Sequence, residues 1–289
     1  MKIVIFGKDG QVGRALQARL PGAVALARAE ADFEHPESLA SIIGREGPDI
    51  IINAAAYTAV DAAENDRARA WIINADALEA IGNAAVKSDA LVVHYSTDYV
   101  FSGETSGFQP ETQRPNPMSV YGASKLAGEE RLEASGARHV ILRTSWVYAP
   151  VGKNFALTIL RLARERDTLT VVADQVGAPT AADLIADVTV NILGQPQPGL
   201  YHLAPTGETS WHGYAQFLVA EALAAGATLS LRPEAIQPIP ASQYPAVAPR
   251  PANSRLDTSK LRATFGITLP PWQDGVRQLI RTLRAEGWL

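Results

Sequence analysis

A regular alternation of short apolar runs with longer amphipathic stretches is the feature that most limits how this chain can fold. The apolar runs cover residues 2–6, 23–27, 49–56, 90–101 and 139–148. Between them lie segments whose apolar residues recur at helical spacing. Short strands that alternate with helices at this interval predict a parallel, doubly wound sheet with right-handed crossovers.

The C-terminal half is expected to be organised differently. Proline becomes frequent after residue 148, which predicts irregular, loop-built structure, although residues 199–205 read as a further strand of the first sheet. The predicted fold is therefore α/β, a Rossmann-type doubly wound parallel sheet with a smaller, interleaved C-terminal substrate domain. The dinucleotide-binding domain would comprise residues 1–146 and about 181–203, and the substrate-binding domain residues 147–180 and 204–289.

Bulk composition excludes several classes of function. The 289 residues carry a formal net charge of −4 and no basic block, so binding to nucleic acid or to an anionic membrane is not expected. The absence of cysteine rules out disulfides, thiolate metal sites and cysteine nucleophiles, and fits a reducing compartment. The N-terminal apolar run is too short for a signal peptide, and no later run approaches a membrane span. A cytoplasmic protein is expected.

A glycine-rich segment, GKDGQVG at residues 7–13, stands directly between the first strand and the first helix. Glycines there allow a tight turn and the close approach of a pyrophosphate, whose negative charge the helix N-terminus favours. The spacing is G-x-x-G-x-x-G rather than G-x-G-x-x-G, but the strand–turn–helix context predicts a dinucleotide site. Its candidate contacts are Gly7, Gly10, Gln11, Val12 and Gly13.

The end of the second strand discriminates between the two nicotinamide cofactors. An acidic residue there accepts the ribose 2′-hydroxyl of NAD, whereas an arginine accommodates the 2′-phosphate of NADP. This chain has Arg28, with Lys8 in the turn as a second cation and Glu30 as a competing carboxylate. We therefore predict NADPH as the cofactor, with NADH tolerated.

A tyrosine and a lysine stand one helical turn apart in SVYGASKLAGE, residues 119–129. At a spacing of i and i+4, Tyr121 and Lys125 leave the same face of a helix. A free phenol has a pKa of about 10, and a nearby ammonium would favour the phenolate. The strand that ends HYSTDYVF carries further hydroxyl groups to the carboxyl edge of the sheet, where doubly wound sheets bind ligands.

These residues resemble the extended short-chain dehydrogenase/reductase superfamily, whose centre is a Ser or Thr, a Tyr and a Lys in Tyr-x-x-x-Lys. The resemblance selects Thr97, three positions ahead of Val100 and Phe101, as the hydroxyl residue. It implies that Tyr121 donates the proton and that Lys125 lowers the tyrosine pKa and binds the nicotinamide ribose. Thr97 would hold the substrate carbonyl oxygen, and the cofactor would supply the hydride.

Seven runs in family order narrow the resemblance to the dTDP-4-dehydrorhamnose reductases: GQVG, NAAAYTAVDAAE, STDYVF, VYGASKLAGE, RTSWVY, QVGAPT and RPANSRLDTSKL. That family reduces the 4-keto group of dTDP-4-dehydro-L-rhamnose to give dTDP-L-rhamnose, a precursor of bacterial surface polysaccharide. The resemblance places Asn74 at a structural position near the active centre. It implies cofactor contacts, the first two at the adenine, by Asp32, Phe33, Ala54, Ala55, Ala56, Tyr57, Thr58 and Tyr95. It implies substrate contacts by Thr97, Asp98, Trp146 and Arg255, with Asn253 and Ser254 as weaker candidates.

Other functions remain open at this point. Nucleotide-sugar 4,6-dehydratases and epimerases share the fold, but dehydratases carry an Asp-Glu pair after the threonine, whereas this chain reads Thr97-Asp98-Tyr99. Epimerases tend to have an acidic residue where Arg28 stands. A non-catalytic NADP(H)-binding regulatory subunit is the alternative outside the enzymes.

A metal-linked dimer is the one family property that the sequence argues against. Some members of the family are associated with Mg²⁺ held by glutamates, one of them on the first helix. Here that helix begins at residue 14 with Arg-Ala-Leu-Gln and carries no carboxylate there. We therefore predict no metal, and a monomer or weak homodimer.

Overall fold

The computed structural model describes residues 1–289 and has one central sheet of six parallel strands. Their order is β10-β5-β4-β3-β1-β2. β2 lies on one side of β1 and β3 on the other, so the strand order reverses at β1, as in a doubly wound sheet. The predicted fold class is confirmed. The strands are β1 Ile3–Phe6, β2 Val24–Leu26, β3 Ile50–Asn53, β4 Leu91–Thr97, β5 His139–Thr144 and β10 Gly199–His202.

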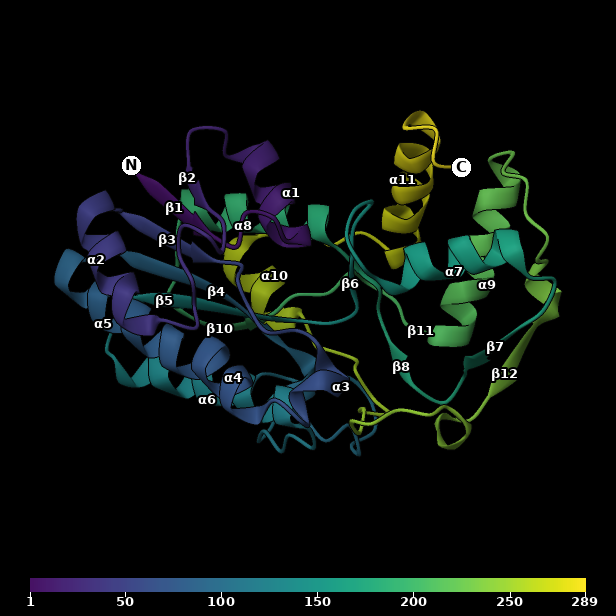
Figure 1. The fold of residues 1–289 in the computed structure, drawn as a ribbon, viewed down its shortest axis with the longest axis horizontal. Coiled ribbons are helices and arrows are strands. Elements are labelled where there is room, and N and C mark those ends of the chain that lie inside the picture. The colour runs from purple at the N-terminus through teal and green to yellow at the C-terminus, as the bar shows by residue number, and fades with distance from the viewer.

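Helices cover both faces of the sheet (Figure 1). Alternate residues of β1 face opposite cores, Ile3 and Ile5 on one side and Val4 and Phe6 on the other, because a strand has a side-chain period of two. Every residue of β1, β3 and β4 is buried, which explains their continuous apolar runs. The helices on one face are α2 Pro36–Glu46, α5 Ala77–Ser88 and α6 Val120–Ala134, and those on the other are α1 Gln11–Arg19, α8 Ala182–Gly194 and α10 Ser259–Phe265.

The C-terminal half is more regular than the proline count predicts. Three helices pack around a third apolar core: α7 Phe155–Glu165, α9 Trp211–Ala224 and α11 Trp272–Ala285. The prediction of loop-built structure is wrong for these segments, because no proline falls inside α7 to α11 and the prolines of this half stand before or between those helices. Three two-stranded sheets join them: β6 Val147–Tyr148 with β9 Thr180–Ala181, β7 Leu169–Val172 with β12 Ile236–Ile239, and β8 Val176–Gly177 with β11 Thr209–Ser210.

The predicted domain boundaries stay a prediction. Leu261 and Leu269 lie in the segment expected to join the second domain, yet both pack in the core between the sheet and α8. No helix of the structure combines the length and the apolar character that a membrane span requires.

Three predicted elements end or break earlier than their apolar patterns suggest, and each break lies near the site described below. The single helix expected over 66–87 is α4 Arg67–Trp71 and α5, joined by a π-helical segment over Ile72–Asp76. The strand expected over 90–101 ends at Thr97 and continues as a 3₁₀ turn. The strand expected over 139–148 breaks before Trp146. A short helix, α3 Val60–Ala63, follows β3.

Candidate active site

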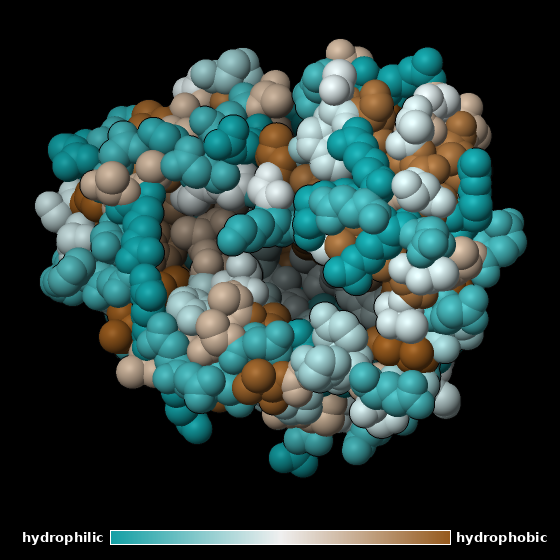
Figure 2. All heavy atoms as spheres, turned by 45° about the vertical axis from the view of Figure 1, so that its right-hand side comes forward, coloured by the Kyte–Doolittle hydropathy of each residue, from teal (hydrophilic) through white to brown (hydrophobic).

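A cleft of about 400 Å³ opens where β1, β3, β4 and β5 reach their carboxyl ends. Figure 2 shows a hollow near the middle of the face that it presents, with hydrophilic residues along much of its rim. The cleft joins the glycine-rich turn to the Tyr-x-x-x-Lys helix, which are more than a hundred residues apart in the chain. The predicted residues that line it are Gly10, Gln11, Val12, Ala54, Ala55, Ala56, Thr58, Tyr95, Thr97, Asp98, Tyr121, Lys125 and Trp146.

The glycine-rich turn is pressed against the loop that follows β3. Gly7 has φ +83°, and a Cβ there would lie 2.6 Å from the Ala55 nitrogen and 2.8 Å from the Ala54 oxygen. Only glycine fits both that conformation and that approach. No side chain caps the first turn of α1, where Gln11 and Val12 line the cleft. The free N–H groups of this turn suit an anionic pyrophosphate.

Helix α6 is held at its N-terminus by two side chains from outside the helix. The Ser119 hydroxyl accepts a hydrogen bond from the Gly122 nitrogen at 3.1 Å, and the Glu64 carboxylate accepts one from the Val120 nitrogen at 2.8 Å. Both satisfy N–H groups that the helix itself leaves free. These caps fix the first turn of α6, where Tyr121 stands.

The same helix lies directly against the π-helical segment. A Cβ at Gly128 would come within 2.1 Å of the Asn74 carbonyl oxygen, so the two backbones touch. The Asn74 amide donates to Ser124 Oγ at 3.0 Å and to the Tyr57 carbonyl at 3.1 Å. Asn74 therefore ties α6 to the loop after β3, which agrees with the predicted structural position.

Lys125 is buried behind the cleft, with 1% of its surface exposed. Its Nζ donates to the Tyr95 carbonyl at 2.7 Å and lies 2.9 Å from His94 Nε2. Burial lowers the pKa of Lys125 to about 7, against the negative charge of Glu129, which raises it. The lysine therefore loses its proton far more easily than an exposed one.

The environment of Tyr121 shifts its pKa upward rather than downward. Burial raises the pKa of Tyr121 to about 12, while a hydrogen bond with Thr97 lowers it and the charge of Asp98 raises it. Loss of hydration dominates this shift and the charge of Lys125 is not among its causes, so the lowering by Lys125 that the resemblance implies stays a prediction. A phenol in this environment keeps its proton at neutral pH.

The turn after β4 presents a carboxylate to the cleft. Thr97 Oγ1 donates to Asp98 Oδ1 at 3.1 Å and accepts from the Tyr99 nitrogen at 3.2 Å. Burial raises the pKa of Asp98 to about 6, against hydrogen bonds with Ser254 and Thr97 that lower it, and its Oδ2 makes no hydrogen bond of good geometry. Ser96 Oγ and Thr144 Oγ1 are also buried without a partner, and both residues line the cleft. Buried polar groups without partners are rare, so this group indicates a place for a polar ligand.

Trp146 owes its place in the cleft to an unusual backbone conformation. Its φ is +48°, a region that bulky side chains seldom adopt, and this bend ends β5. The indole stacks on Trp211 of the C-terminal half with 3.6 Å between the ring centroids. Trp146 therefore joins the sheet to the second half of the molecule at the cleft wall.

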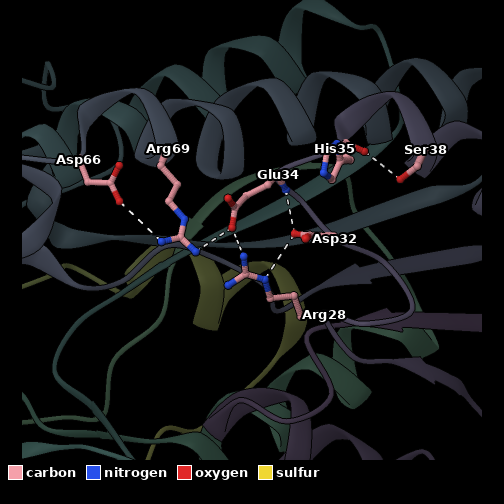
Figure 3. A network of polar contacts seen from close by, with 7 residues as sticks. All are labelled: Arg28, Asp32, Glu34, His35, Ser38, Asp66 and Arg69. Atoms are coloured by element: carbon pink, nitrogen blue, oxygen red, sulfur yellow. Dashed lines mark hydrogen bonds and ion pairs between the residues drawn. The ribbon is translucent and has the colours of Figure 1, made fainter.

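The cations expected near the 2′-phosphate are already paired with carboxylates. Figure 3 shows Arg28 and Arg69 both pointing toward Glu34. Arg69 lies 2.7 Å from Glu34, and Arg28 contacts both Glu34 and Asp32, the latter at 3.4 Å. Lys8 pairs with Glu30 at 2.6 Å. Arg69, on α4, is a cation that the sequence analysis missed, because only the fold brings it beside Arg28.

Some residues that were predicted to contact the cofactor use their side chains for contacts within the protein. Phe33 is 4% exposed and packs edge to face on Phe6 at 5.5 Å, so it is a core residue in this structure. Tyr57 donates its hydroxyl to Asp66 at 3.3 Å. The Tyr95 hydroxyl bonds Thr189 of α8, and only its backbone carbonyl meets Lys125.

In the proline-rich segment, two residues that were predicted to contact the substrate are bonded to other residues of the protein. Arg255 lies 3.2 Å from Glu208 and donates to Asn253 Oδ1 at 2.8 Å. The Asn253 amide donates to the carbonyls of Thr105 and Gly107, so it supports the loop after β4. Arg255 is therefore ion-paired rather than a free cation, and it is not among the residues that line the cleft.

The sequence analysis did not predict several of the residues that line the cleft. Most stand within a few positions of a strand's carboxyl end, which is the one rule that could have found them. Lys153 lies in the loop after β6 and reaches the cleft only through the fold. The missed lining residues are Asn53, Val60, Ser96, Tyr99, Thr144, Ser145, Val147 and Lys153. No three His, Asp or Glu side chains are grouped so that they could hold a metal ion.

Residues 1–285 match the family described as the RmlD substrate binding domain. The chain belongs to this family. The dTDP-4-dehydrorhamnose reductase of Salmonella typhimurium is 46% identical to it over 97% of each chain. A solved dTDP-4-dehydrorhamnose reductase from Clostridium acetobutylicum is 32% identical, with a TM-score of 0.92 over 98% of this chain and 100% of its own. The Bacillus anthracis enzyme, solved in complex with NADP, is 32% identical, with a TM-score of 0.91 over 97% of this chain and 99% of its own. The predicted family and enzyme class, an oxidoreductase, are confirmed.

Proposed function

We propose that this chain reduces the 4-keto group of dTDP-4-dehydro-L-rhamnose with NADPH and releases dTDP-L-rhamnose. The observation that carries the proposal is one cleft lined by the glycine-rich turn, Thr97, Tyr121 and Lys125. It is supported by similarity to dTDP-4-dehydrorhamnose reductases over nearly the whole length of the chain.

Tyr121 is the proposed proton donor. NADPH, when bound, supplies the hydride for the carbonyl carbon of the sugar. Tyr121 gives its phenolic proton to the carbonyl oxygen as that carbon is reduced, so the product leaves as an alcohol. The upward-shifted pKa of Tyr121, about 12, keeps that proton in place at neutral pH. Thr97 orients the same oxygen once its hydroxyl turns from Asp98 Oδ1, to which it donates at 3.1 Å, toward the substrate.

The proposed cofactor contacts follow the walls of the cleft. The N–H groups of Gln11 and Val12 would receive the pyrophosphate, and the segment from Ala54 to Thr58 would contact the cofactor. Lys125 has one N–H bound to the Tyr95 carbonyl and a further N–H for the nicotinamide ribose. Arg28 receives the 2′-phosphate, which has to compete with Glu34 for it.

The proposed substrate contacts use the groups that lack partners. Asp98 Oδ2 is buried and makes no hydrogen bond of good geometry, although Ser254 interacts with the same carboxylate, so a sugar hydroxyl is its expected partner. Trp146 offers an aromatic surface at the opposite wall. Arg255 meets the nucleotide diphosphate, in competition with Glu208.

The test is an absorbance assay at the reduced nicotinamide band, with NADPH and a panel of 4-keto sugar nucleotides. We expect turnover with the dTDP-linked 6-deoxy sugar. Tyr121→Phe should keep the fold and NADPH affinity but lower kcat by about 10²–10⁴, the usual contribution of a placed general acid. Thr97→Val is the companion variant and should lower turnover with cofactor affinity intact. Stoichiometric NADPH binding without turnover of any sugar would contradict the proposal and favour a regulatory subunit.

We also propose that the chain divides into a dinucleotide-binding domain, 1–146 with about 181–203, and a substrate-binding domain. The protein is proposed to be a monomer or weak homodimer, and to be located in the cytoplasm. Sedimentation over a range of concentrations tests the oligomeric state, and a stable higher oligomer would contradict it.

A further inference from the structure

Two buried polar side chains behind Lys125 have no part in the reaction described so far. Asn53 ends β3 and is 2% exposed, and His94 lies in β4 and is 1% exposed. The strand register pairs the two residues directly. Asn53 Nδ2 lies 3.2 Å from His94 Nδ1, and Nε2 of the same ring lies 2.9 Å from Lys125 Nζ. The three side chains form one hydrogen-bonded row from the sheet to the cleft.

The orientation of the Asn53 amide is determined by the backbone. The Ala55 nitrogen donates to Asn53 Oδ1 at 3.0 Å, and a backbone N–H can only donate. The oxygen of the amide must therefore face Ala55, and its NH₂ group must face His94 Nδ1. Since an NH₂ group of an amide donates and does not accept, His94 Nδ1 has to be the acceptor.

The histidine tautomer follows from that bond. A neutral imidazole has one N–H and one bare nitrogen, so the proton of His94 lies on Nε2, facing Lys125. This N–H needs an acceptor. An ammonium has three donors and no lone pair, whereas a neutral amine has a lone pair and two N–H groups. Only the neutral form of Lys125 completes the row while still donating to the Tyr95 carbonyl.

We propose that Asn53 and His94 are positioning residues that hold Lys125 as a neutral amine in the cofactor-free enzyme. Protonation of Lys125 then requires His94 Nε2 to become an acceptor, with its proton on Nδ1, and the Asn53 amide to turn away from Ala55. The row takes up one proton from solvent in this change. The inference deepens the proposed function, since it rests on the role of Lys125 there.

The charged groups around the row are compatible with this state. Glu129, on the same helix, favours the ammonium of Lys125, but its carboxylate is bound by Arg143 at 2.9 Å and 2.5 Å. Burial lowers the pKa of His94 most, and the positive charges of Lys125 and, from β5, of His139 lower it further. Neutral forms are therefore favoured at both ends of the His94–Lys125 contact.

The direct test is the ¹⁵N NMR spectrum of the histidine rings in the cofactor-free enzyme near pH 8. The chain supplies an internal reference, because His202 Nδ1 lies 2.9 Å from the Gln109 carbonyl, which only accepts, so His202 carries its proton on Nδ1. We expect the opposite tautomer at His94, assigned by the loss of its signals in His94→Gln. A proton on Nδ1 of His94 would overturn the proposal. The spectrum needs no turnover, so its outcome is independent of whether the reductase activity is found.

A second test reverses the tautomer. Asn53→Asp keeps an acceptor for the Ala55 N–H and replaces the NH₂ group by a second acceptor. The His94 proton should move to Nδ1, and the Lys125 side-chain signal should titrate at a higher pH than in the wild type. Thr58→Asp is the matched control, because it adds a carboxylate to the same cleft without facing His94, and it should leave the tautomer unchanged. If Asn53→Asp leaves both the tautomer and the Lys125 titration as in the wild type, the row does not control Lys125.

Discussion

Replacement of Lys125 by methionine should change the stability of the folded protein by an amount that depends on pH. Methionine is close to lysine in length and removes the buried nitrogen. Burial lowers the pKa of Lys125 from 10.5 to about 7. Since each pKa unit is worth about 1.36 kcal/mol, keeping the ammonium in the folded state costs about 5 kcal/mol well below pH 7.

The sign of the pH dependence follows from proton binding. Between about pH 7 and pH 10.5 the unfolded chain holds the Lys125 proton and the folded chain does not, so the wild type gains stability as the pH rises. Lys125→Met lacks this gain. The stability of Lys125→Met relative to the wild type should therefore fall by about 2 kcal/mol from pH 7 to pH 9. Urea unfolding of both proteins at several pH values measures it, because all other titrating groups cancel in the difference.

An exposed lysine provides the control. Lys87, at the end of α5, is exposed, and Lys87→Met should shift the unfolding curve by the same small amount at every pH. Parallel curves for the wild type and Lys125→Met between pH 7 and pH 9 would refute the reasoning. They would mean that Lys125 has a hydrated or strongly paired environment in the folded state.

Three further predictions concern packing, cofactor choice and the carboxylate of the cleft. Gly128→Ala should lower the free energy of unfolding by about 1–3 kcal/mol, because its Cβ would lie 2.1 Å from the Asn74 oxygen; an unchanged urea midpoint would contradict the close contact. Arg28→Ala should weaken NADPH binding by about 1–3 kcal/mol with little effect on NADH, and Glu34→Gln should tighten NADPH, as measured by fluorescence titration. Equal effects of these variants on both cofactors would show that Arg28 does not meet the 2′-phosphate. Asp98→Asn should gain stability over the wild type, by up to about 3 kcal/mol, as the pH rises from 3.8 to about 6, because the folded state binds that proton more tightly; a constant difference would contradict the raised pKa.

The sequence alone determines the sheet and the place of the site. The apolar runs of β1, β3 and β4 are buried on both faces, so their pattern is visible without the fold. The glycine-rich turn and the Tyr121–Lys125 spacing are local features, since each depends on a few consecutive residues. Because parallel strands end at one edge, these local features were enough to predict that the turn and Tyr121 lie near the end of β4, where the family resemblance selected Thr97.

Breaks in the regular elements depended on contacts from distant segments. The apolar pattern continues through Trp146, yet its backbone turns to φ +48° and its ring stacks on Trp211, 65 positions later in the chain. The helices of the C-terminal half were hidden by the prolines that stand between them. The pattern of residues that are close in sequence gives no information about contacts between distant segments.

The chemical state of the site was decided by the tertiary structure. The sequence places an ammonium near a phenol and predicts a lowered tyrosine pKa, but burial raises the pKa of Tyr121 and lowers that of Lys125. In the same way, Arg28 is a free cation in the sequence and the partner of Glu34 in the fold. Residue spacing specifies which groups share a helix face, whereas hydration, burial and ion pairing depend on every segment that packs around them, and these terms set the protonation of each group.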